Sequence, residues 1–209
     1  MTRRTALLIL LSIACVAIMA STASSFAADP RYPDWPCNQA KVPEISVAAV
    51  WNGPPLDDAT KDWKDDAKVN ALVPRLAARR TPIDEAETTI KEFLANAKSD
   101  KTREALRLFA GLFDTLNAQR SSVMNGLERV TRKQRDAAEK IRSDIQALHA
   151  LQDAPDSDQT KVEELNNQVL WETRIFEDRR RVVSFVCEVP TAVDQRLFAL
   201  ARIIQQEID

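Results

Sequence analysis

Apolar residues recur at helical spacing over one long stretch of the chain, residues 101–152. The steps between them are mostly three or four residues, close to a heptad repeat, and no proline interrupts them. The stripe consists of Phe109, Phe113, Leu116, Val123, Leu127, Val130, Ala137, Ile141, Ile145, Leu148 and Leu151. A helix of about 52 residues would be about 78 Å long. One helix cannot bury its own stripe, so another part of the chain must pack along it.

A second apolar pattern begins at Gln159 and supplies that partner. It consists of Val162, Leu165, Val169, Phe176, Val183 and Val186, with Trp171 nearby. The acidic segment around Pro155 separates the two patterns and predicts a turn. We therefore expect an antiparallel helical hairpin, a coiled coil, over residues 101–187 with its tip near Pro155. Pro190 should end the returning helix, and a C-terminal helix should follow over residues 191–208.

Shorter helices should form a base for this hairpin. Thr81 and Pro82 predict a helix start, with Thr81 as the N-cap and Pro82 at the first helical position. An earlier helix is expected near residues 59–73, limited by Pro74. The first third of the long helix carries a wide apolar face, which suits several neighbours. We predict a base of three or four helices, built from the helix after Pro82, the start of the long helix and the C-terminal helix.

The composition supports an all-α fold. The helical patterns together place one helical domain at residues 57–209. The 209 residues include only three glycines and one tyrosine, too few turn residues for a β-rich fold. Gly111 and Gly126 each weaken the long helix by about 1 kcal/mol relative to alanine. Because the apolar phase carries through both glycines, we expect a continuous helix that can bend.

Residues 1–27 resemble a secretory signal peptide. Arg3 and Arg4 precede an apolar run, and small residues lead to Ala27. The alternative is a retained membrane anchor, but the run is shorter than the ~20 residues that a membrane span needs. We expect cleavage, a periplasmic location and no stable membrane span afterwards. Cleavage would remove two arginines and no acid, which shifts the net charge from −2 to −4.

Two cysteines, Cys37 and Cys187, remain after residues 1–27 are removed. In an oxidising compartment an even pair predicts a disulfide. The bond would close a loop of about 150 residues and contribute about 4–5 kcal/mol in the chain-entropy model. The alternative is a redox-active or metal-binding thiol pair, which usually has the C-x-x-C spacing that this pair lacks.

The segment from residue 28 to 56 is rich in proline, so an extended arm is expected there. It also carries Trp35, Val50 and Trp51, which a free linker would not. We therefore expect the arm to pack on the helices, held by Cys37.

The arm also carries a recognisable box: Asp34-Trp35-Pro36-Cys37-Asn38-Gln39, then Val42-Pro43, Ser46 and Trp51-Asn52-Gly53-Pro54. This box resembles one found in uncharacterised secreted proteins of proteobacteria. The resemblance covers roughly the first quarter of the chain after the signal sequence. It implies a periplasmic helical protein and carries no activity with it.

Residues able to carry catalysis are sparse in the sequence. His149 is the only histidine, and the chain has no Gly-rich phosphate loop, G-x-S-x-G or H-E-x-x-H motif. The acids at residues 57–66 could hold a divalent metal, but a helix start beside lysines explains them better. The acids at residues 153–158 lack the glycine and glutamate of a calcium loop. No catalytic residue, cofactor or metal is predicted, and the net charge excludes a typical nucleic-acid binder.

These patterns favour a non-catalytic interaction protein whose hairpin packs against a protein partner. Arg179, Arg180 and Arg181 could dock an anionic partner, but an exposed face at the end of a helix explains them better. A second hypothesis is a ligand-binding or enzymatic bundle with a pocket beneath the Trp35–Trp51 arm. A third is a chaperone-like clamp, which would require oligomerisation.

Overall fold

A computed structural model of the chain describes residues 29–56 and 62–208. The chain divides into two compact units, Met1–Pro33 and Asp34–Asp209. The described part of the first unit is a turn in which the Tyr32 N–H donates to the Asp29 carbonyl at 2.9 Å. The predicted signal peptide lies outside the described residues. Within the described ranges no helix is long and apolar enough to cross a membrane.

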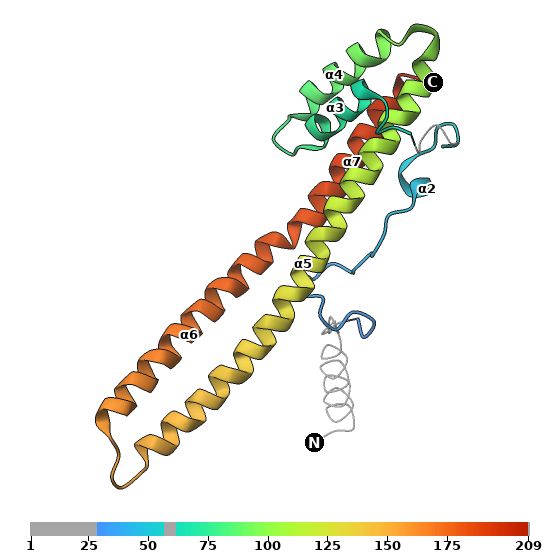
Figure 1. The fold of residues 1–209 in the computed structure, drawn as a ribbon. Helices are drawn as coiled ribbons and strands as arrows, with labels where there is room; N and C mark the ends of the chain where they lie inside the picture. Colours follow the sequence, from blue (N-terminus) through green and yellow to red (C-terminus); the bar gives the residue numbers. More distant parts are fainter. Residues whose placement is uncertain (1–28, 57–61, 209) are drawn as a thin grey trace, which may run out of the picture. The chain divides into compact units, whose positions relative to one another are not determined.

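The second unit is helical, and the described residues contain no strand, which confirms the all-α fold. Its helices are α2 (Val47–Val50), α3 (Ala67–Ala77), α4 (Ile83–Ala95), the 3-10 helix η2 (Lys98–Asp100), α5 (Lys101–Gln152), α6 (Gln159–Val186) and α7 (Glu188–Gln206). Figure 1 shows α6 and α7 following one another along α5, with α3 and α4 at the end where α7 lies. We call α3, α4, α7 and the first part of α5 the base.

The long helix forms as the sequence predicts. Helix α5 spans 52 residues and is continuous through Gly111 and Gly126. The predicted turn follows it, and α6 begins at Gln159. Asp158 caps α6, because its side chain accepts hydrogen bonds from the N–H groups of Thr160 (3.1 Å) and Lys161 (3.4 Å). This cap explains one of the acids in the turn without a calcium ion.

The base has a closely packed core to which four helices contribute. Its largest fully buried side chains are Phe109, Leu76, Ile90, Leu94, Leu108, Leu112, Leu116, Leu197, Leu200, Ile204, Val69 and Val73. Gly111 is part of this packing. A Cβ atom there would lie 2.6 Å from a methyl carbon of Val73 and 2.9 Å from the ring of Trp63. Glycine therefore lets these two side chains approach the backbone of α5.

The prediction for the first short helix was wrong in its bounds. Helix α3 runs from Ala67 to Ala77 and contains Pro74, which was expected to end it. Asp66 sets the start, since its side chain accepts from the N–H groups of Lys68 and Val69. Pro74 costs the helix one backbone hydrogen bond. Burial of Leu76 and Ala77 beyond it offsets that loss.

Two further helix starts differ from the predictions by a few residues. Pro82, not Thr81, is the N-cap of α4; the Thr81 hydroxyl instead donates to the Arg75 carbonyl at 2.8 Å. Helix α7 begins at Glu188 rather than at residue 191, so Pro190 lies inside its first turn. An N–H group has no helical partner at that position, so proline is tolerated there. The break between α6 and α7 falls at Cys187.

Candidate interaction surface on the helical hairpin

An extended segment, residues 34–43, connects α5 to the junction between α6 and α7; we call it the strap. Cys37 in the strap is bonded to Cys187 at the α6–α7 junction, with an S–S distance of 2.02 Å and a Cα–Cα distance of 5.5 Å. The predicted disulfide is therefore confirmed. The Gln39 side-chain amide also donates to the Cys187 carbonyl at 2.5 Å. The strap thus holds the end of α6 by one covalent bond and one hydrogen bond.

Charged residues attach the strap to α5. Asp34 forms ion pairs with Arg132 (2.9 Å) and Arg135 (2.7 Å), and Lys41 pairs with Glu128 at 2.5 Å. Hydrogen bonds from the two arginines hold the pKa of Asp34 below its usual value. The strap therefore covers the side of α5 that carries residues 128, 132 and 135.

A partly buried ion pair joins α5 to α7 next to the strap. The Arg120 Nε atom donates to an Asp194 carboxylate oxygen at 2.7 Å, and Arg120 also reaches the Pro43 carbonyl at 3.3 Å. Burial raises the pKa of Asp194, and this effect outweighs the opposing attraction of Arg120. Arg120 thus connects three segments of the chain at the level where the hairpin leaves the base.

The segment after the strap packs into the base. Val50 and Trp51 are buried, and the Trp51 ring stacks on Phe109 with a centroid distance of 4.2 Å. The Trp51 indole N–H donates to the Pro54 carbonyl at 2.8 Å. Trp51 is therefore part of the core.

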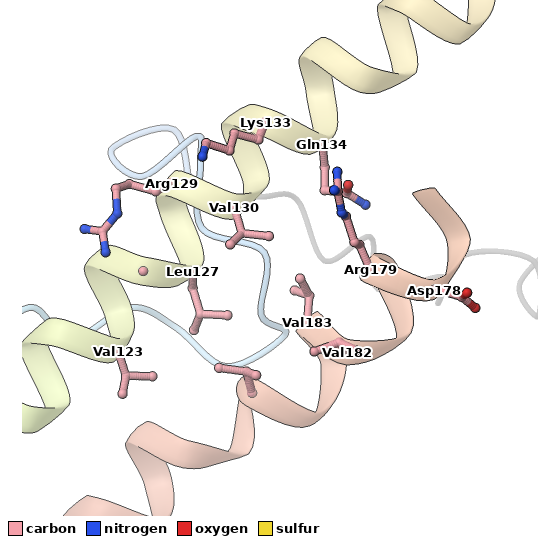
Figure 2. Close-up of a pocket in the computed structure, with 12 residues that line it drawn as sticks. Val123, Leu127, Arg129, Val130, Lys133, Gln134, Asp178, Arg179, Val182 and Val183 are labelled. Atoms are coloured by element: carbon pink, nitrogen blue, oxygen red, sulfur yellow. The ribbon is translucent and has the colours of Figure 1, made fainter. Parts of the chain in front are cut away.

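An apolar groove of about 720 Å³ lies between α5 and α6, on the hairpin side of the disulfide. Its apolar lining comes from both helices: Val123, Leu127 and Val130 of α5, and Val182, Val183 and Val186 of α6. Figure 2 shows side chains of the two helices facing each other across it. Toward the tip, the Gln134 side-chain amide donates to the Phe176 carbonyl at 3.0 Å and bridges the helices. A smaller hollow of about 180 Å³ follows beyond this bridge.

Gly126 lines the groove and lies on a different side of α5 from the residues that the strap covers. A Cβ atom at Gly126 would have a single neighbour within 4 Å, the Arg129 Nη2 atom at 3.8 Å. A methyl group at this position would therefore touch only the Arg129 side chain, at an ordinary contact distance.

Basic side chains border the groove. Arg129 and Lys133 lie one helical turn apart on α5, and Arg179 lies on α6 (Figure 2). None of the three forms an ion pair with any residue in the described ranges. Asp178, the one acid in the lining, is paired with Arg181. The groove therefore has a net positive rim.

The structure separates the three arginines that the sequence grouped as a candidate docking site. Arg179 lines the groove, while Arg181 is occupied by Asp178. Arg180 is exposed and is not part of the lining. Because neighbouring residues on a helix point about 100° apart, three consecutive arginines cannot share one face.

Helix α6 also exposes large apolar side chains on its outer surface. The exposed fractions are 61% for Leu170, 64% for Trp171, 58% for Val182 and 76% for Phe185. At about 100° per residue these positions fall within an arc of about 120°. Val182 belongs both to this outer face and to the groove, so the two apolar surfaces are continuous.

Gly126, Lys133 and the outer face of α6 were not singled out by the sequence as parts of a site. Gly126 was interpreted only as a weak point in the helix. The sequence signal for the outer face was Trp171, an apolar residue that does not follow the helical spacing of the apolar stripe in its own helix.

The remaining candidates from the sequence are His149 and the acidic residues. His149 is exposed on α5 near the turn. Of the acids at residues 57–66, Asp57 and Asp58 lie outside the described residues, and Asp66 caps α3. Among residues 29–56 and 62–208, no three His, Cys, Asp or Glu side chains are placed to hold a metal ion.

The arrangement defines a class: an all-α protein with a strapped helical hairpin on a packed helical base. Comparisons with family models, with curated proteins and with solved structures find no match. The function is therefore argued from the surface of the hairpin itself.

Proposed function

We propose that this is a non-catalytic periplasmic interaction protein whose hairpin presents a coiled-coil surface to a protein partner. The observation that carries the proposal is the apolar surface on the hairpin next to an apolar groove. Four apolar side chains of α6 are more than half exposed there: Leu170, Trp171, Val182 and Phe185. Single exposed apolar residues are ordinary on protein surfaces. Four on one side of a helix, continuous with a groove, are typical of an interaction surface.

The location is proposed from three features. Residues 1–27 have the pattern of a secretory signal, and the N-terminal box resembles that of secreted proteobacterial proteins. The disulfide between Cys37 and Cys187 suits an oxidising compartment. A periplasmic partner is the corresponding expectation.

The alternative of a ligand pocket beneath the Trp35–Trp51 arm finds less support. Trp51 packs on Phe109 in the core, and the Trp35 indole N–H donates within the strap to the Gln39 carbonyl at 2.7 Å. Both rings are thus engaged in holding the arm.

Affinity purification from the native periplasm tests the proposal. The mature protein would be compared with a variant in which a short Gly-Ser linker replaces residues 128–180. The hydrogen bond from Gln134 to Phe176 joins the two antiparallel helices, and Leu127 and Val182 line the same groove, so a short linker can join the remaining ends. We expect the partner to be lost from the shortened variant, provided that it still melts cooperatively and retains the disulfide.

The matched control changes an exposed apolar side chain on the base, Phe198→Ser. This variant should retain the partner. Identical partner sets for the mature and shortened proteins would contradict a role for the hairpin.

A further inference from the structure

We infer that the groove between α5 and α6 is the seat of an amphipathic helix with acidic flanks, supplied by the partner protein. This inference rests on the proposed function and adds the chemistry of the partner element. It is built on the space above Gly126, the apolar floor of the groove and the charge of its rim.

The two glycines of α5 argue for a docked backbone. Gly111 is required within the chain, since a Cβ atom there would overlap Val73 and Trp63. Gly126 has no such requirement, because its Cβ position meets only the tip of Arg129. A glycine in a helix interior costs about 1 kcal/mol relative to alanine. At Gly126 this cost brings no packing within the described chain, but it opens the floor for close approach by another helix.

The dimensions of the groove suit a helix. It is framed by two antiparallel helices and contains about 720 Å³. Helices pack with their axes about 8–10 Å apart, and small residues at the contact bring them closer. A third helix laid over Gly126 would contact Val130 on one side and Val182 on the other, and so complete a three-helix layer.

The positive charge of the rim favours a partner helix with acidic flanks. Arg129 and Lys133 border one side and Arg179 the other, without acidic partners among the described residues, and Asp178 is held by Arg181. An amphipathic helix with Asp or Glu beside its apolar stripe would pair with these cations. A helix with basic flanks would be repelled.

The strap explains why only this side of the hairpin is available. Asp34 and Lys41 occupy the side of α5 that carries Glu128, Arg132 and Arg135. The groove side carries Arg129 and Lys133, which form no ion pair with the strap. The strap thereby fixes the hairpin from one side and leaves the other open to a partner.

Site-specific photocrosslinking in cells tests the inference with the full chain. A benzophenone amino acid would replace Val182 in the groove, or, as reference positions, Leu170 on the outer face and Phe198 on the base. Crosslinked peptides would be sequenced by mass spectrometry. We expect the Val182 position to crosslink to one protein segment with apolar residues at i, i+3, i+4 and i+7 and Asp or Glu beside them.

Variants in the same chain sharpen the test. Gly126→Leu fills the groove with a good helix former and should lower crosslinking from position 182 about tenfold, while the melting temperature does not fall. Arg129→Glu combined with Lys133→Glu should lower it by a similar factor. Arg180→Glu is a single charge reversal outside the groove and should leave the crosslinking unchanged, whereas Arg129→Glu alone should lower it.

The outcomes separate the groove from the broader proposal. Crosslinks to a basic segment or to lipid from position 182 would overturn the inference. Crosslinks to protein from Leu170 but not from Val182 would also overturn it, yet leave the hairpin as the interaction surface. If neither position crosslinks to a protein, both the inference and the proposed function fail.

Discussion

The base and the hairpin share one helix, α5, but use it in different ways. In the base, every residue of α5 from Leu108 to Leu112 is buried, and α7 contributes eight buried residues along its length. In the hairpin, α6 has a single buried residue, Val169, over 28 positions. The base therefore completes its own core, whereas the hairpin leaves apolar surface uncovered.

The hairpin is held by a narrow apolar seam and by its connections. Lys140 pairs with Glu172 of the opposite helix at 2.7 Å and with Asp144 at 2.6 Å, and all three side chains are partly exposed. Exposed pairs of this kind contribute about 0–1 kcal/mol each. The turn joins the two helices at one end, and at the other the strap joins them, through the disulfide to Cys187 and the ion pairs to α5. The difference in burial shows that the hairpin does not form a second core. It presents a surface and is supported by the base.

Truncation of matched leucines should show the difference most strongly. Leu108→Ala removes a fully buried side chain of the base, and we expect the free energy of unfolding to fall by about 2–5 kcal/mol. Leu170→Ala removes an exposed side chain of α6 and should change it by less than about 0.5 kcal/mol. Urea denaturation of both variants provides the measurement. Equal losses would contradict the assignment of Leu170 to the surface.

Removal of the disulfide should release the hairpin from the strap. Cys37→Ser combined with Cys187→Ser should lower the free energy of unfolding by about 2–5 kcal/mol, because the bond closes a loop with a sequence separation of 150. Denaturation under oxidising conditions measures the loss, and the reduced wild-type protein is the control. A double variant as stable as the oxidised wild type would contradict the claim that the disulfide of the strap stabilises the protein.

The two glycines of α5 should respond to alanine with opposite signs. Gly111→Ala places a methyl group against Val73 and Trp63 and should destabilise the protein by about 1–3 kcal/mol. Gly126→Ala meets only the Arg129 side chain, at an ordinary contact distance, and should stabilise it by up to about 1 kcal/mol. Thermal melts of the two variants make the comparison. Destabilisation by Gly126→Ala would show that the groove is already filled.

Acid should weaken the ion pairs between the strap and α5. The pKa of Asp34 is lowered by hydrogen bonds from Arg132 and Arg135, so its contribution to stability is complete above the unfolded pKa of about 4. That contribution is lost as the pH falls through the lower pKa of the folded protein. We expect wild type and Asp34→Asn to differ slightly at pH 7 and to converge near pH 2. A difference that stays constant with pH would rule out the charge of Asp34 as its cause.

Local sequence patterns predicted the parts of the fold that depend on one segment or on a cysteine pair. The bounds of α5, the turn before Gln159 and the Cys37–Cys187 bond all follow from spacing and from cysteine count. The bounds of α3 did not, because burial of Leu76 and Ala77 overrides the tendency of Pro74 to end a helix.

The groove could not be predicted in the same way. Its volume depends on how far α5 and α6 stand apart, which the strap and the neighbouring helices determine. Gly126 looks the same in the sequence as Gly111, and only their surroundings in three dimensions distinguish them. The pairing of Arg181 with Asp178, three residues apart on one helix, could have been inferred and would have narrowed the arginine cluster to Arg179.

Amide hydrogen exchange tests the central claim most directly, measured on the free protein and on its complex with the crosslinked partner. In the free protein, the amides of α6 near Val182 should exchange faster than those of α7 near Leu200. In the complex, exchange near Val182 and Gly126 should slow at least tenfold while the base is unchanged. Slow exchange of α6 in the free protein, or new protection confined to α3 and α4, would contradict an open hairpin that docks its partner.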